Sequence, residues 1–478
     1  MKYKILTLAL FSMTILYPFF AEAETEKEET LRFLEQRYDQ IAGIAHSLWE
    51  YAELGYQEKH SSALLQEALK AEGFKIQKGV ANIPTAFVAS WGTGTPVIGI
   101  LAEYDALPGI NQAAKPVREK IEGKASAHAC GHNLFGAGSA GAVIAVKHWL
   151  ENTGSKGTIR LYGTPAEEGG SGKVYMVREG LFDDVDFALH WHPDSANAAS
   201  AVSTLANRSA KFRFHGVSAH ASLAPERARS ALDGVEAFNH MVNMMREHIP
   251  QEARIHYVIT NGGNTPNVVP DFAEVYYYVR HSEAKKVRKI WQRVENAARG
   301  AALGTGTEVD WEIVHGNHPL LINETLSRMV DEKLRIVGGV NYNKAEQAFA
   351  EKIHATLESP AQPLGNESKV QPYDIIQDYG STDVGDVSVT VPTVGLGTAT
   401  FVPGTSLHSW QAVAAGGMSI GYKGAHVASK VLTLAAIELF ENPILRSTAQ
   451  EEFEQRRGSN FVYIPLLGNR DPPLDYRK

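Results

Sequence analysis

The residues best suited to chemistry lie around the only cysteine of the chain, Cys130. His132 follows it two positions later, with Gly131 between them. In an extended loop, side chains at this spacing can point the same way, as two ligands of one metal ion do. Coordination would hold the thiol as a thiolate and shield it from oxidation. The sequence therefore predicts a metal ligand here, against the alternative of a buried, inert cysteine.

An adjacent pair of carboxylates, Glu167 and Glu168, follows an apolar run and precedes two glycines. Neighbouring residues of an extended chain point in opposite directions, so one carboxylate can bind a metal ion while the other reaches a bound water. Hydrolysis needs this division of work, because a Lewis acid polarises the carbonyl and a base removes a proton from the water. The pair favours a metal-dependent hydrolase over a solvated surface pair.

Three further histidines are candidate ligands. His190 and His192 end an apolar, strand-like run, and their spacing places both rings on one face of an extended chain. His408 lies in a loop near the C-terminal end. The run from Gly136 to Gly141 matches a dinucleotide-binding fingerprint, but it lies inside a helical pattern, so we interpret it as close helix packing.

The elements that must position these residues alternate between strands and helices. Residues 25–72 predict two helices, followed by strands at 85–91, 96–103, 158–163 and 186–191 and helices at 136–150 and 173–179. Such alternation predicts the α/β class, with helices around a mostly parallel sheet and sites at the strand ends. Helices are also expected at 323–338, 343–357 and 421–441, with an extended tail after Ser447.

The pattern changes near residue 200. Strands at 211–215, 256–260 and 274–280 and helices at 230–247 and 284–301 predict a small α+β domain inserted in the first. The expected division is a catalytic domain formed by residues 24–198 and 316–478 and an inserted domain formed by residues 199–315.

The first 23 residues predict a signal peptide, because Lys2 and Lys4 precede an apolar run and Ala21-Glu22-Ala23 fits a cleavage site. We expect an exported, periplasmic protein with no membrane contact after cleavage; a retained N-terminal anchor is the alternative. The net charge is −8 and the chain has no basic stripe, so composition gives no support for nucleic-acid binding.

Over nearly the whole mature chain, the motifs together resemble the di-metal aminoacylase and amidohydrolase family, metallopeptidase family twenty. They are His-Ala-Cys-Gly-His-Asn at 128–133, Pro-Ala-Glu-Glu-Gly-Gly at 165–170, Trp-His-Pro at 191–193, Ala-His-Ala at 219–221, Pro-Asn-Val-Val-Pro at 266–270, Ser-Thr-Asp-Val-Gly-Asp at 381–386 and Leu-His-Ser-Trp at 407–410. The resemblance implies cleavage of N-acyl or N-aroyl amino acids, such as aminobenzoyl-glutamate. A dipeptidase or an N-acetyl amino acid deacetylase is the alternative. A non-catalytic, metal-bearing binding protein is less favoured because the expected base is present.

The resemblance also implies residue roles. Cys130 would be shared by two divalent metal ions, zinc or manganese, whose other ligands would be His132, Glu168, His192 and His408. Glu167 would be the general base, and Asp105 and His190 would orient ligands from outside the coordination sphere. Glu103 stands where many relatives carry a histidine and is not assigned as a ligand.

The inserted domain resembles the lid and dimerisation domain of the family. His220 would reach across a homodimer to the oxyanion, and Asn267 and Arg280 would contact the substrate, with Arg280 suited to a carboxylate. A heteromeric assembly is the alternative to the homodimer.

Overall fold

The computed structural model describes residues 25–477. The predicted signal peptide, residues 1–23, lies outside this range. Within the described range, no helix is both long and apolar enough to cross a membrane.

A six-stranded sheet forms the centre of the larger part of the molecule, in the order β1-β2-β6-β3-β7-β15. Its strands are β1 (Lys75–Lys78), β2 (Phe87–Thr93), β3 (Val97–Ala102), β6 (Gly157–Gly163), β7 (Phe187–Leu189) and β15 (Thr393–Val394). β6, β3, β7 and β15 run parallel, whereas β2 pairs antiparallel with both of its neighbours, β1 and β6. Every residue of β3 is buried, as expected for a central parallel strand covered on both faces. The predicted α/β class with a mainly parallel sheet is confirmed.

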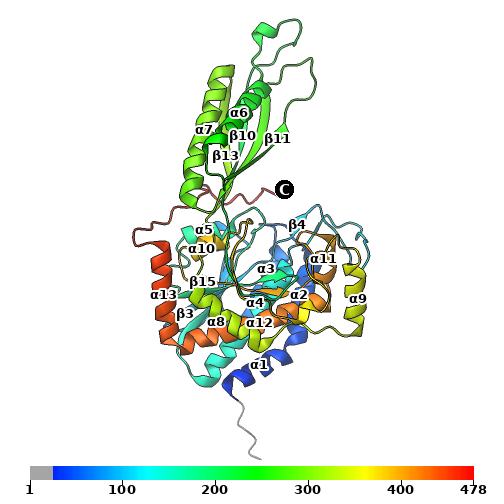
Figure 1. Cartoon of the computed structure of the whole chain (residues 1–478), viewed down its shortest axis with the longest axis vertical. Helices are drawn as coiled ribbons and strands as arrows, with labels where there is room; N and C mark the ends of the chain where they lie inside the picture. Colours follow the sequence, from blue (N-terminus) through cyan, green and yellow to red (C-terminus); the bar gives the residue numbers. More distant parts are fainter. Residues whose placement is uncertain (1–24, 478) are drawn as a thin grey trace, which may run out of the picture.

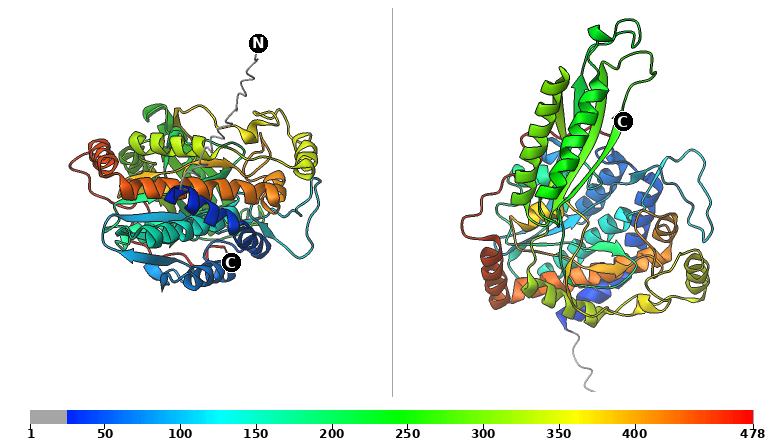
Figure 2. Two further views of the ribbon diagram at one scale, coloured as in Figure 1. Left: turned by 90° about the horizontal axis from the view of Figure 1, so that it is seen from below. Right: turned by 45° about the horizontal axis from the view of Figure 1, so that its top comes forward.

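The helix α4 (His132–Thr153) fixes the position of the Cys130 loop, which immediately precedes it. It packs against β3 and β6, and α1 (Glu26–Gln36), α2 (Tyr38–Tyr51) and α12 (Ser419–Glu441) pack on it in turn (Figures 1 and 2). A Cβ at Gly138 would lie 2.8 Å from Trp191, and one at Gly141 would lie 2.7 Å from Ile41. The glycines of this run therefore serve close packing, in agreement with the prediction.

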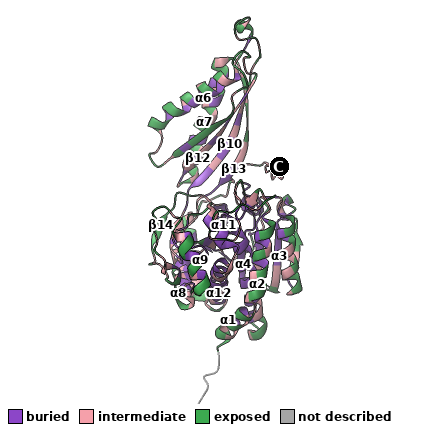
Figure 3. Cartoon of the chain, turned by 90° about the vertical axis from the view of Figure 1, so that its right-hand side faces the viewer, coloured by how far each residue is buried: buried purple, intermediate pink, exposed green. Residues whose placement is uncertain are grey.

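The other elements of the larger part, which Figure 3 shows around a buried centre, surround this core. They are α3 (Lys59–Ala71), β4 (Leu107–Pro108), β5 (Ser126–Ala127), α5 (Gly172–Arg178), β8 (His192–Asp194), β9 (Ala201–Ser203), α8 (Glu324–Val337), α9 (Lys344–His354), β14 (Ile375–Gln377), α10 (Val384–Ser388), β16 (Gly397–Ala399), α11 (Trp410–Gly416) and α13 (Pro443–Arg457), with short 3₁₀ turns at 80–82 and 366–368.

Two sequence expectations about helices were wrong. Residues 25–72 form three helices rather than two, because the chain breaks between α1 and α2 at Arg37, whose backbone is not helical. The segment after Ser447 is not extended at first, because α13 continues to Arg457. Asn442 caps the start of α13, and Phe453 of this helix is buried. Tertiary packing therefore stabilises a helix that is difficult to predict from its charged sequence.

A separate antiparallel sheet rises above the larger part, in the order β11-β12-β10-β13 (Figure 1). Its strands are β10 (Ala206–His215), β11 (Arg254–Asn261), β12 (Phe272–His281) and β13 (Glu308–Asn317). α6 (Ala231–Met245) and α7 (Ala284–Thr305) cover one face and share a hydrophobic core with it. Alternate residues of β12 are buried against these helices, so the other set faces away from them. We call this unit the lid.

The last described residues, 458–477, form a tail that runs between the lid and the larger part (Figure 1). Leu466 belongs to the hydrophobic core of the lid, and the next residue, Leu467, belongs to the core of the larger part. Arg470 pairs with Glu312 of β13 at 2.8 Å. The tail therefore contacts both units before it reaches the site described below.

Candidate active site

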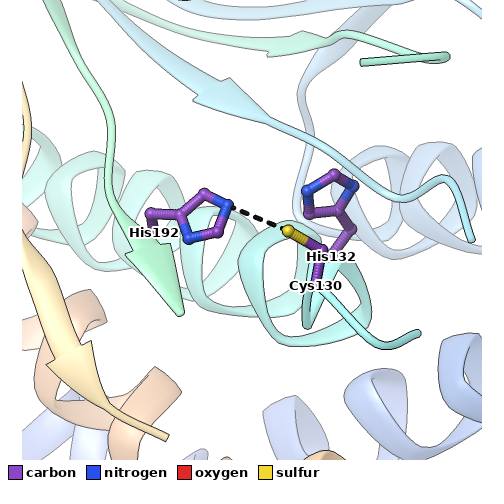
Figure 4. A group of neighbouring side chains, drawn as sticks. All are labelled: Cys130, His132 and His192. Carbon is purple, nitrogen blue, oxygen red and sulfur yellow. Dashed lines mark hydrogen bonds between the residues drawn. The ribbon is translucent and has the colours of Figure 1, made fainter. Parts of the chain in front are cut away.

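The loop before α4 presents Cys130 to His192. Gly131 adopts a left-handed conformation with φ of 78°, and a Cβ there would lie 2.6 Å from Pro193. This close approach places Sγ of Cys130 3.5 Å from Nε2 of His192 (Figure 4). Nδ1 of His192 donates to the carbonyl of Pro193 at 2.8 Å, which leaves Nε2 as the ligand atom.

His132, in the first turn of α4, is held by two carboxylates that follow β3. Its Nδ1 donates to Asp105 at 2.8 Å, and its Nε2 lies 3.1 Å from Oε2 of Glu103. Nε2 of His132 and Oε2 of Glu103 are both buried and have no hydrogen-bond partner. Asp105 thus fixes the tautomer that leaves Nε2 free, as carboxylates do for metal-binding histidines.

Glu168 and His408 form a neighbouring group. Nε2 of His408 lies 3.2 Å from Oε1 of Glu168, which is another buried atom without a hydrogen-bond partner. The backbone N–H of Glu168 donates to Asp105 at 2.9 Å, and Glu58 accepts from the N–H of Ala166 at 2.9 Å. The turn that carries the carboxylate pair is therefore anchored on both sides.

Three clusters of candidate ligands result, each with its ligand atoms within 4.8 Å of one another: Cys130, His132 and His192; Cys130, Glu168 and His408; and Glu103, His132 and Glu167. The first two share Cys130. The unpartnered atoms of Glu103, His132 and Glu168 converge on this region. One thiolate, imidazoles and carboxylates form a donor set that fits divalent metal ions.

The electrostatics of the site support this fit. Burial raises the pKa of the Cys130 thiol well above its ordinary value, so a bound cation is needed to keep it ionised. Burial also raises the pKa of Glu167, and the charges of Glu103 and Glu168 raise it further. A carboxyl with a raised pKa is suited to accept a proton and release it again.

A buried lysine, Lys173 of α5, pairs with two carboxylates beside the site. It donates to Glu103 and to Asp383, both at 2.7 Å, and its side chain is completely buried. Burial lowers the pKa of Lys173, but the two carboxylates raise it by more. Burial raises the pKa of Asp383 to about 6, although Lys173 opposes this. Lys173 therefore compensates the negative charge collected beside the candidate ligands.

A cavity of about 720 Å³ opens above the site, between the lid sheet, the larger part and the tail. Glu167, Glu168 and His408 line one side. Arg280, at the end of β12, lines the opposite side and donates to Ser381 at 3.1 Å. The structure therefore brings Arg280, expected to contact substrate, into the same cavity as the expected base.

The remaining predicted residues are His220, Asn267 and His190. His220 is exposed in the loop between β10 and α6, where its backbone pairs with Val268 in an isolated antiparallel β-bridge. Asn267 is exposed in the loop that contains Val268. Neither residue lines the cavity. Between His190 and His192 the chain leaves β7 at Leu189 and joins another sheet at β8. Burial lowers the pKa of His190 to about 4, and the charges of Glu103 and His192 also act on it, so His190 lies near the candidate ligands. The ring of His190 packs against Gly395.

His128, next to Cys130 in sequence, takes no part in the candidate ligand groups. It bonds the carbonyl of Leu48 at 3.0 Å, and burial lowers its pKa to about 3.

Comparison with known proteins agrees with this architecture. The model of peptidase family M20/M25/M40 matches residues 99–362. The chain belongs to this family. Among curated M20 relatives, a subunit of the p-aminobenzoyl-glutamate hydrolase of Escherichia coli (strain K12) is 40% identical, covering 93% of this chain and 99% of that protein. Xaa-Arg dipeptidase of Homo sapiens is 28% identical over 91% of this chain and 93% of its own length. Family membership and these curated relatives identify the chain as a hydrolase of amide bonds.

Solved M20 structures share the fold. A dinuclear metal-binding peptidase of the M20 family from Bacillus subtilis has a TM-score of 0.58 at 18% identity, covering 85% of this chain and 99% of its own. The aminobenzoyl-glutamate utilization protein of Klebsiella pneumoniae has a TM-score of 0.60 at 17% identity, covering 85% and 97%. The arrangement of a central sheet and a separate lid is therefore common to M20 proteins of low sequence identity.

Sequence reasoning missed three residues that contact the site. Glu103 received no ligand role, yet it faces His132; its place directly after a buried strand was the available signal. Asp383 lies in the Ser-Thr-Asp-Val-Gly-Asp motif, whose residues carry no predicted role. Nothing near Lys173 in the sequence signals that it pairs with carboxylates 70 and 210 positions away.

Proposed function

We propose that the protein is an exported, two-metal hydrolase of N-acyl or N-aroyl amino acids, with aminobenzoyl-glutamate as the leading substrate. The observation that carries the proposal is the pair of ligand groups that share Cys130. The 40% identity to a subunit of p-aminobenzoyl-glutamate hydrolase supports the choice of substrate.

The residues present define how the metals would be held. His132 and His192 would bind one ion and Glu168 and His408 the other, with Cys130 between them. Zinc or manganese, when bound, would polarise the scissile carbonyl and lower the pKa of a water. The unpartnered Oε2 of Glu103 lies beside His132, so Glu103 would contribute charge to the same ion.

The chain's own groups would then move the proton. Glu167 accepts the proton of the attacking water and passes it to the leaving amine, a task that its raised pKa suits. Arg280 binds the carboxylate of the amino-acid part by charge-assisted hydrogen bonds from across the cavity.

His220 would act in a second copy of the chain, since it does not line the cavity of its own subunit. The strand β11 supports a homodimer, because it is an edge strand of the lid sheet. Its Tyr257, Val258 and Ile259 are exposed apolar side chains. An assembly with a different chain is the alternative, and light scattering of the purified chain separates the two.

The decisive test is Glu167→Gln. We expect turnover of aminobenzoyl-glutamate to be lost while the metal content per chain is unchanged, because the base is removed and the ligands stay. Glu151→Gln, at an exposed ion pair of α4, serves as the control and should retain activity. Full activity of Glu167→Gln, or wild-type protein carrying less than one metal ion per chain, would refute the mechanism.

A panel of substrates tests the choice within the class. Hydrolysis of dipeptides or N-acetyl amino acids without hydrolysis of aminobenzoyl-glutamate would favour the dipeptidase or deacetylase alternative. Export is tested by cell fractionation with and without residues 1–23; a cytoplasmic full-length chain would contradict it.

A further inference from the structure

Four lysine or arginine side chains line the cavity above the site: Lys211, Arg280, Arg470 and Arg477. Two of them are paired with carboxylates, since Lys211 lies 3.9 Å from Glu274 and Arg470 lies 2.8 Å from Glu312. Arg280 and Arg477 have no ion-pair partner among residues 25–477. Guanidinium groups in a cavity without a counter-ion are suited to bind anionic groups of a ligand.

Arg280 reaches the cavity from the lid. Its guanidinium lies over the ring of Tyr278, at 5.4 Å from the ring centre, and donates to Ser381 at 3.1 Å. Burial lowers the pKa of Arg280, which reflects a charge removed from water without a compensating carboxylate. A substrate carboxylate would supply that compensation.

Arg477 reaches the same cavity from the tail, on the side of the candidate metal ligands. It donates to the backbone carbonyl of Glu168, and it lies 5.0 Å from the ring centre of Tyr476. Its Nε is buried without a hydrogen-bond partner. The guanidinium therefore has an unused donor, and Arg477 lines the cavity next to the turn that carries the expected base.

The tail segment that carries Arg477 is fixed to the larger part. Gln57 donates to the carbonyl of Leu474 at 2.8 Å, and the rings of Tyr56 and Tyr476 pack edge to face at 5.6 Å. The position of Arg477 is thus set by contacts with the loop that precedes α3 rather than by the lid.

Two tyrosine hydroxyls lie on the lid wall between the two arginines. Tyr276 donates to Tyr278 at 3.1 Å, and both line the cavity from the same face of β12 as Arg280. Burial raises the pKa of Tyr276, and the nearby charge of Arg477 lowers it in part, which places Arg477 within electrostatic reach of this hydroxyl. The cavity is therefore lined by two separate guanidinium groups, those of Arg280 and Arg477, and by the hydroxyls of Tyr276 and Tyr278.

We propose that Arg477 of the tail determines specificity by binding the side-chain carboxylate of a dicarboxylic amino acid, while Arg280 binds the α-carboxylate. The preferred substrates are then N-acylated glutamate or aspartate rather than N-acylated neutral amino acids. This inference rests on the proposed function; it narrows the substrates to N-acylated dicarboxylic amino acids and assigns their recognition to a residue outside the family motifs.

The test compares two substrates that differ in one group, aminobenzoyl-glutamate and aminobenzoyl-glutamine. Their kcat/KM values are measured with the wild type, with Arg477→Met and with Arg477→Lys, each checked for metal content. We expect the wild type to prefer the glutamate compound, and Arg477→Met to reduce that preference by about tenfold or more, as the loss of a hydrogen bond to a charged group predicts. The loss should fall on the KM of the glutamate compound, and Arg477→Lys should restore part of it.

Lys211→Met is the matched control, because Lys211 lines the same cavity but already faces Glu274. It should leave the preference unchanged. An equal loss of activity toward both substrates in Arg477→Met would mean that Arg477 only positions the Glu168 turn, and this would overturn the inference. A wild type that cleaves both equally would also overturn it, while leaving the proposed function in place. A wild type that cleaves neither would remove the proposed function and the inference together.

Discussion

Replacing Lys173 by methionine tests whether the buried charges of Lys173, Glu103 and Asp383 are coupled. Lys173 fits between Glu103 and Asp383, and in each ion pair both side chains are at most 2% exposed. Methionine keeps most of the volume of lysine but removes the charge and all three donors. Two buried carboxylates then lose their partner at the same time.

The magnitude follows from the burial of the pair. Removing one partner of a buried ion pair costs about 3–5 kcal/mol, because the remaining charge is left in a low-dielectric interior. Protonation of the carboxyls offsets part of this cost at low pH. A carboxyl whose pKa is raised in the folded state contributes stability that is lost as pH rises through that pKa. Without Lys173, which opposes the effect of burial, the pKa of Asp383 should rise above about 6. The variant should therefore lose more stability at pH 8 than at pH 5.

The free energy of unfolding is measured by urea denaturation of metal-depleted protein, followed by tryptophan fluorescence, at both pH values. Lys115→Met is the control, because Lys115 and Glu119 form an ion pair at 2.6 Å with side chains 56% and 46% exposed. Such a surface pair contributes less than about 1 kcal/mol. If Lys173→Met lies within about 1 kcal/mol of the wild type at pH 8, the argument from burial is wrong.

Three further substitutions address the residues around the site. Asp105→Asn removes the charge that orients His132, so metal affinity, measured by competition with a chelator, should fall about 10–100-fold; unchanged affinity would contradict the assigned hydrogen bond. Burial and Asp105 raise the pKa of Glu58 to about 8, so the wild type loses stability as pH rises from about 4.5 to 8, and Glu58→Gln should flatten that dependence in urea titrations. Gly131→Ala introduces a Cβ 2.6 Å from Pro193 at φ of 78°, which should lower stability by about 1–3 kcal/mol in thermal melts; a neutral effect would show that the loop relaxes freely.

Local patterns were sufficient to predict the strand β3 and the helix α4. The fully apolar sequence of β3 and the small residues of α4 both indicate buried elements, because such sequences are stable only when they are packed in a core. Local patterns failed at α13, whose charged sequence resembles a solvated tail. The helix is stabilised by the burial of Phe453, a contact that depends on distant parts of the chain.

The candidate site divides in the same way. The kinds of ligand and the resemblance to a family could be predicted from the motifs around Cys130, Glu168 and His192. Residues within one short motif are close in space whatever the rest of the fold is. The position of His192 relative to His190 could not be predicted from the sequence, since it depends on a change of sheet between the two residues.

The sequence by itself determined that this protein carries a thiol, imidazoles and a carboxylate pair in motifs typical of a two-metal amide hydrolase. Only the tertiary structure decided which of these side chains meet, that Lys173 balances Glu103 and Asp383, and that Arg477 of the tail enters the cavity. The physical reason for this difference is that a motif contains only residues that are close to one another along the chain. Charge compensation and cavity shape arise from groups that folding brings together across hundreds of residues.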